Sequence, residues 1–159
     1  MSRVSSMLVC LALLATPHDR AEAQAPFACN LLTSAEVETA AGWKPAASES
    51  KTYGTTGTCT FTGDAAKRQV VVLSVAKPAP KVASSAAFAE RRIADGKRTP
   101  ELATRAAPIE GLGAPAIRSD DGSGPATIEA VTAGRIVSVT APTVEAATAL
   151  AKKAIPRVR

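Results

Sequence analysis

The sequence is poor in two residue types on which much protein chemistry depends. It has one histidine, His18, in 159 residues, and aromatic residues make up only 3% of the chain. Imidazole is the usual general base of nucleophilic catalysis and the commonest ligand of catalytic zinc. The reactions that the protein could catalyse therefore depend on whether the mature chain retains His18.

Residues 1–23 have the three parts of a secretory signal peptide. Arg3 supplies the positive charge, an apolar segment covers residues 7–15, and Ala21 and Ala23 are small residues at the positions that a signal peptidase reads. The apolar segment is too short to span a bilayer. We expect cleavage before Gln24, which makes the protein secreted or periplasmic and leaves no transmembrane segment in it.

This cleavage removes His18 together with Cys10. Cys10 follows Val9 inside the apolar segment, whereas a lipid anchor needs a small residue before a cysteine at the end of that segment, so a lipoprotein is disfavoured. Without histidine, Ser-His and Cys-His pairs are excluded, and only carboxylate-pair or Ser-Lys chemistry remains. The acidic residues are scattered, and the single adjacent pair, Asp120-Asp121, opens the turn-like stretch "DDGSG". We predict no catalytic residues, no metal site and no cofactor.

Two cysteines remain after export, Cys29 and Cys59. In an oxidising compartment one disulfide is the default, and free or intermolecular thiols are the alternatives. A disulfide that closes a loop of about 30 residues stabilises the fold by about 3 to 4 kcal/mol in the chain-entropy model. A metal site is disfavoured because the exported chain has no histidine and no C-x-x-C pair.

Three helices are predicted from capping residues and apolar spacing. In "LLTSAEVETAAGW", Thr33 and Glu36 have the spacing of a capping box, and Gly42 provides a stop. A second helix is expected over residues 84–96. The stretch "TVEAATALAKKAI" predicts a C-terminal helix with Thr143 as its N-cap.

Strands are predicted where apolar residues alternate. Val71, Leu73 and Val75 define one apolar face of "RQVVVLSVA", which indicates a central strand, and "TCTFT" precedes it. A short strand is expected over 116–119, and two alternating runs around Ala133-Gly134 indicate a hairpin. The polar stretch "KPAASESKTYGTTG" is predicted to be a connector.

These elements predict one α+β domain over residues 24–159 with one disulfide. We expect the helices to pack on one face of a curved antiparallel sheet. The order of a helix followed by strands recurs in the second half of the chain, which suggests two pseudo-repeated helix-plus-strands units.

The formal net charge of +5, with a sequence pI near 9.4, favours anionic partners. Export disfavours nucleic acid, so an anionic component of the cell envelope is the candidate. Surface contacts to it are expected from two basic clusters. They are Arg91, Arg92, Lys97 and Arg98, and Lys152 and Lys153 with Arg157 and Arg159.

A protein partner would need an anchor side chain, and aromatic residues are few here. Interface hot spots are rich in Trp, Tyr and Arg. Trp43, the one tryptophan, is therefore the candidate anchor for an envelope protein.

Several short motifs together resemble a known group of proteins. They are "CNLLTSAEV", "AAGW", "GTCTFT", "GLGAPA", "IEAVTAGRIVSVTA" and "EAATALAKKAI". The chain resembles small exported bacterial proteins and lipoproteins of unknown function, which are similar in pattern to the extracellular sensor domains of some bacterial Ser/Thr kinases. The resemblance covers essentially all of residues 24–159 and implies an α+β fold, a Cys29–Cys59 disulfide and no assigned catalytic residues. The chain departs from the pattern at Ala114, where the group has Asp, and lacks the lipid-anchoring cysteine of many members.

The expected function is that of an exported, non-catalytic binding or sensor-like module of the cell envelope. An inhibitor or protein partner of an envelope enzyme is the alternative. A histidine-free hydrolase that uses carboxylates is a third and weaker hypothesis.

Overall fold

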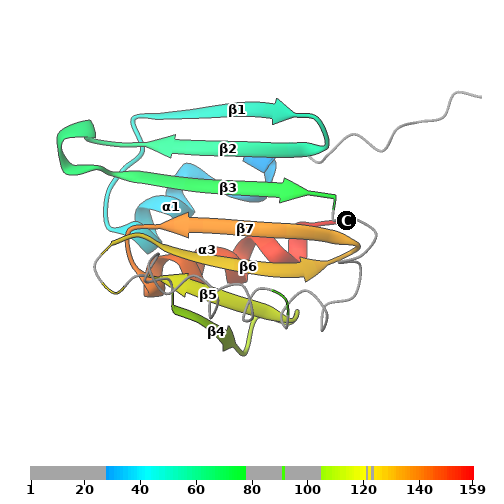
Figure 1. The fold of residues 1–159 in the computed structure, drawn as a ribbon. Coiled ribbons are helices and arrows are strands. Elements are labelled where there is room, and N and C mark those ends of the chain that lie inside the picture. Colours follow the sequence, from blue (N-terminus) through cyan, green and yellow to red (C-terminus); the bar gives the residue numbers. More distant parts are fainter. Residues whose placement is uncertain (1–27, 78–90, 92–104, 121, 123) are drawn as a thin grey trace, which may run out of the picture.

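The computed structural model describes residues 28–77, 91, 105–120, 122 and 124–159 (Figure 1). The predicted signal peptide over 1–23 lies outside the described residues. So does the predicted helix over 84–96, except for Arg91.

The described chain forms an open, antiparallel, seven-stranded sheet in the order β1-β2-β3-β7-β6-β5-β4, which confirms the α+β class (Figure 1). Strands β1 to β3 form one meander and β4 to β7 another, and β3 pairs with β7 where the two meet. The strands are β1 (Ala47–Tyr53), β2 (Thr56–Thr62), β3 (Val70–Ala76), β4 (Arg105–Ile109), β5 (Ala116–Asp120), β6 (Ala126–Thr132) and β7 (Arg135–Ala141). The α-helices are α1 (Ser34–Ala41) and α3 (Val144–Ala154), and the 3-10 turns are η1 (Ala28–Leu31), η2 (Ala65–Lys67) and η5 (Ile155–Arg157).

Both described helices begin at their predicted caps. The Thr33 side chain accepts a hydrogen bond from the Glu36 backbone, and the Glu36 carboxylate accepts one from the Thr33 backbone, which completes the capping box. Gly42 ends α1 with φ of 75°, a left-handed conformation that costs glycine little. Thr143 caps α3 through a bond from the Ala146 backbone.

The core lies between α3 and the inward side chains of the central strands. Val71, Leu73 and Val75 are fully buried, as their alternation predicts. Leu150 of α3 is also fully buried, and α3 contacts both β6 and β7. Burial of each such side chain is worth about 1.5 to 3 kcal/mol.

The predicted hairpin is confirmed and the short strand over 116–119 becomes β5. Ala133 and Gly134 form the β6–β7 turn with φ of 47° and 67°. Turns with two left-handed residues match the twist of the strands they join, which explains why this pair can close the hairpin.

Two strands contradict the sequence prediction. The stretch predicted to be a connector contains β1, and the residues before β5, for which the sequence predicts no strand, contain β4. All seven residues of β1 are exposed, so it has no apolar alternation to detect, and its strand state comes from pairing with β2. Pro108 lies inside β4, which is tolerated because β4 is the last strand of the sheet.

Candidate functional site

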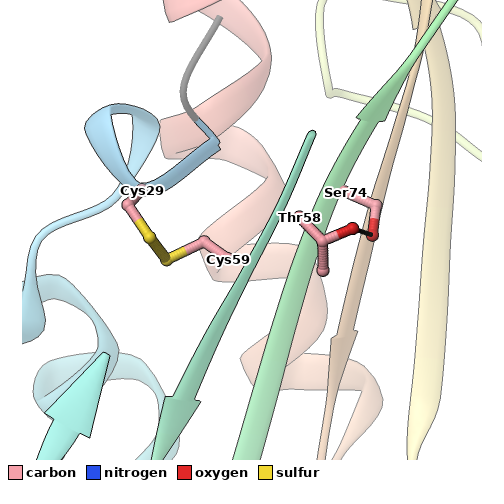
Figure 2. The surroundings of a disulfide bond; sticks show 4 residues. All are labelled: Cys29, Thr58, Cys59 and Ser74. Carbon is pink, nitrogen blue, oxygen red and sulfur yellow. Dashed lines mark hydrogen bonds between the residues drawn. A yellow bond between two sulfur atoms is a disulfide. The ribbon is translucent and has the colours of Figure 1, made fainter. Parts of the chain in front are cut away.

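The predicted disulfide joins Cys29 of η1 to Cys59 of β2, with their Cα atoms 4.9 Å apart. Cys59 is fully buried and Cys29 is half-buried. Figure 2 shows the bond extending from one side of β2 to the turn that precedes α1. Because both sulfurs are consumed in this bond, neither thiol is available as a nucleophile or metal ligand.

A second cross-link joins the two ends of the described chain. Arg157 donates two hydrogen bonds to Glu36, from Nη2 to Oε1 at 2.6 Å and from Nη1 to Oε2 at 2.9 Å. The same Nη1 donates to the Leu31 carbonyl at 2.9 Å. The Arg157 hydrogen bonds lower the pKa of Glu36 from 4.5 to about 2; burial opposes this, and bonds from Thr33 assist it. Glu36 thus serves both the capping box and the attachment of the C-terminal segment.

The Arg157–Glu36 ion pair shows that the members of the second predicted basic cluster differ in their contacts. Arg157 is engaged with Glu36, whereas Lys152 and Lys153 are exposed in the last turn of α3, where the helix dipole favours cations. In the first predicted cluster, Arg91 is exposed. Its other members, Arg92, Lys97 and Arg98, lie outside the described residues.

Trp43, the predicted partner anchor, packs against the core. Its indole is half-buried, and a Cβ added to Gly63 would come within 2.6 Å of the ring atom Cε3. Among the described residues, the large aromatic side chain at the surface is Tyr53 at the end of β1, which is 66% exposed. The sequence could not indicate this exposure, because no apolar pattern marks β1 as a strand.

The side of the sheet opposite Cys59, Leu73 and Val139 carries rows of hydroxyl groups, and toward β5 the same side carries a small apolar cluster of Ile117, Val131 and Ile136. Along β2 every outward residue is threonine, and the register continues these rows across the neighbouring strands. Thr58 faces Ser74, which faces Ser138, and the Thr58 and Ser74 oxygens lie 3.2 Å apart. We call this surface the hydroxyl face. It comprises Thr56, Thr58, Thr60, Thr62, Ser74, Thr127, Ser138 and Thr140, all half-buried.

The hydroxyl face and the disulfide lie on opposite sides of β2, as Figure 2 shows for Thr58 and Cys59. The disulfide therefore stabilises the strand that supplies half of the hydroxyls without occupying the surface they form. A second cross-strand pair, Thr127 and Thr140, has its oxygens 2.9 Å apart. Backbone pairing between neighbouring strands thus sets the distances between the hydroxyls that they carry.

The hydroxyl face can exchange hydrogen bonds, because each hydroxyl both donates and accepts. Its two internal pairs, Thr58 with Ser74 and Thr127 with Thr140, join hydroxyl to hydroxyl. Charged side chains lie beside it on β1, with Glu49 and Lys51, and within it on β6, where Glu129 faces Ser138.

The part of the chain that the structure describes contains neither a cluster of metal ligands nor a membrane-spanning helix. That part contains no group of three or more His, Cys, Asp or Glu residues that could hold a metal ion. None of its helices has the length and apolar character needed to cross a membrane.

Comparison of the chain with protein-family models, curated protein sequences and solved structures gave no match. The features of the described chain that bear on its function are therefore the disulfide, the exposed strand β1 and the hydroxyl face.

Proposed function

We propose that this protein is an exported, non-catalytic binding module of the cell envelope and that its ligand lies on the hydroxyl face. The observation that carries the proposal is the uninterrupted threonine series on the outward side of β2, continued by serine and threonine on β3, β7 and β6. The Cys29–Cys59 disulfide supports export, because such bonds persist in oxidising compartments.

The chemistry of this surface favours a polyhydroxylated ligand. Hydroxyls on paired strands are held in place before binding, so little conformational freedom is lost when a ligand docks. Val70 and Val72 lie on the same side of β3 and add apolar contact between the hydroxyl rows. A glycan of the envelope, which presents hydroxyls and C–H surfaces at similar spacing, fits this mixture.

We also propose that the two described α-helices, α1 and α3, share the side of the sheet opposite the hydroxyl face. Contacts of α3 with β6, β7 and α1, and of η1 with β1, β2 and β3, support this arrangement. The two meanders that meet at β3 and β7 are compatible with two pseudo-repeated units.

The test is retention of the purified, oxidised protein on isolated, insoluble envelope glycan. Replacing Thr58→Val, Thr60→Val and Ser74→Ala together removes three hydroxyls and both members of one hydrogen-bonded pair. We expect at least about tenfold weaker retention, because each lost hydrogen bond contributes about 0.5 to 1.5 kcal/mol. Thr39→Val is the matched control, since it removes an exposed hydroxyl from α1. Equal retention of the triple variant and the control would overturn the proposed site.

A protein partner of an envelope enzyme is the second candidate, and the exposure of Tyr53 favours it. Tyrosine is frequent among the residues that dominate interface energetics. Tyr53→Ala would then reduce capture of one defined envelope protein by at least about tenfold, whereas Trp43→Ala would act through stability. Unchanged capture by Tyr53→Ala would count against this candidate.

A further inference from the structure

Strand β1 is a long, unprotected edge. It is the terminal strand of the sheet, its seven residues are all exposed, and its register with β2 is continuous over seven positions (Figure 1). Edge strands offer unpaired backbone groups to another strand and are usually blocked by proline, bulges or charged side chains, and the charged residues of β1 are Glu49 and Lys51. The other terminal strand, β4, carries Pro108, whereas β1 contains neither proline nor glycine.

The charges on β1 are arranged as a complementary pair. Glu49 and Lys51 lie two positions apart, on the same side of the strand, and Lys51 Nζ is 3.1 Å from Glu49 Oε1. Both side chains are more than half exposed, so both can reach a strand placed beside β1. Ser50 lies between them.

We propose that β1 pairs antiparallel with β1 of a second copy of this chain, about a two-fold axis at Ser50. In this register Glu49 of each copy faces Lys51 of the other, so four charges alternate in sign along one side of the interface. Tyr53 of each copy faces Ala47 of the other, which gives the exposed ring an apolar contact. The two sheets become one continuous sheet with the hydroxyl faces on the same side.

The charge pattern selects this arrangement over its competitors. If the antiparallel register shifts by two residues, Glu49 faces Glu49 or Lys51 faces Lys51 of the other copy. In a parallel pair in register, Glu49 faces Glu49 and Lys51 faces Lys51, so both contacts are repulsive. A slip of one residue would move the charges to opposite sides of the sheet. A two-fold interface must be self-complementary, and the Glu49-Ser50-Lys51 sequence meets that condition only when its copy is reversed.

This inference goes beyond the proposed function, because it does not depend on a ligand at the hydroxyl face. It is tested by sedimentation of the oxidised protein over a range of concentrations. We expect a concentration-dependent dimer. Lys51→Glu or Glu49→Lys alone replaces two attractive contacts by two repulsive ones and should raise the dissociation constant at least about tenfold.

Two rescue experiments distinguish strand pairing from a general effect of charge. An equimolar mixture of the two single variants should form a heterodimer, since the two acidic side chains on β1 of one chain then face the two basic side chains on β1 of the other. The double variant E49K/K51E should dimerise as the unmodified protein does. The matched controls Lys153→Glu and Glu110→Lys make the same charge changes at exposed positions outside β1 and should leave the dimer unchanged.

The proposal is overturned if the unmodified protein is monomeric at millimolar concentration. It is also overturned if the single variants dimerise as well as their controls, or if neither the mixture nor the double variant regains association. Circular dichroism of each variant establishes that its fold is intact before sedimentation.

Discussion

Replacing Glu36→Gln tests how much the link between the N- and C-terminal segments contributes to stability. The substitution keeps the size of the side chain but removes the charge that accepts two hydrogen bonds from Arg157. The pKa shift of Glu36 from 4.5 to about 2 corresponds to an upper limit of roughly 3 kcal/mol. Because 42% of the Arg157 side chain is exposed, solvent screens the pair, and we expect a loss of about 1 to 2 kcal/mol at pH 7.

The pH dependence has a definite sign. The pKa of Glu36 is lower in the folded protein, so the unfolded chain takes up the proton first as the pH falls. The stabilisation is complete above pH 4.5 and disappears as the pH approaches 2. The difference in unfolding free energy between the unmodified protein and Glu36→Gln should therefore shrink over this range.

Urea denaturation at a series of pH values measures that difference directly. Glu38→Gln is the matched control, because it removes the same charge from an exposed position of α1. A difference between the unmodified protein and Glu36→Gln that stayed constant from pH 7 to pH 2 would refute the assignment of the stabilisation to this ion pair.

Two further predictions concern stability. Replacing Cys29 and Cys59 together by serine should lower the free energy of unfolding, measured by urea denaturation, by about 3 to 4 kcal/mol. The reason is that the loop closed by the disulfide is no longer constrained in the unfolded state. A decrease below about 1 kcal/mol would argue against the chain-entropy account. Gly63→Ala would place a Cβ 2.6 Å from the Trp43 ring and 2.7 Å from Gln69 Oε1, so unfolding should become easier by about 1 to 3 kcal/mol, with a shift in Trp43 fluorescence. Unchanged stability and unchanged Trp43 emission would contradict the close packing of the Trp43 ring against Gly63.

The parts of the fold that could be predicted from the sequence depend on neighbouring residues. The capping box of Thr33 and Glu36, the alternation of Val71, Leu73 and Val75, and the β6–β7 hairpin all have signals within a few positions. The prediction of β1 as a connector is wrong because its strand state depends on β2, and no local apolar pattern reveals it. Pro108 hides β4 for a similar reason, since only its position at the edge makes proline acceptable.

Of the candidate site, only the Cys29–Cys59 disulfide could be predicted from the sequence. The disulfide is the default for the two cysteines that remain after the predicted signal-peptide cleavage, and the resemblance implies the same pair. The hydroxyl face could not be predicted, because it requires the register of β2, β3, β7 and β6, and β3 and β7 are far apart in sequence. The engagement of Arg157 with Glu36, across 121 positions, is likewise hidden, so the sequence alone places Arg157 in a basic cluster.

One measurement tests the central claim of a non-catalytic binding module most directly. Isolated envelope glycan is incubated with the oxidised protein, and both the bound protein and the soluble sugar products are quantified over time. The proposal predicts saturable retention that is weakened by the Thr58→Val, Thr60→Val and Ser74→Ala variant, with no release of soluble products. Release of products that depends on the protein, or an absence of saturable retention, would contradict it.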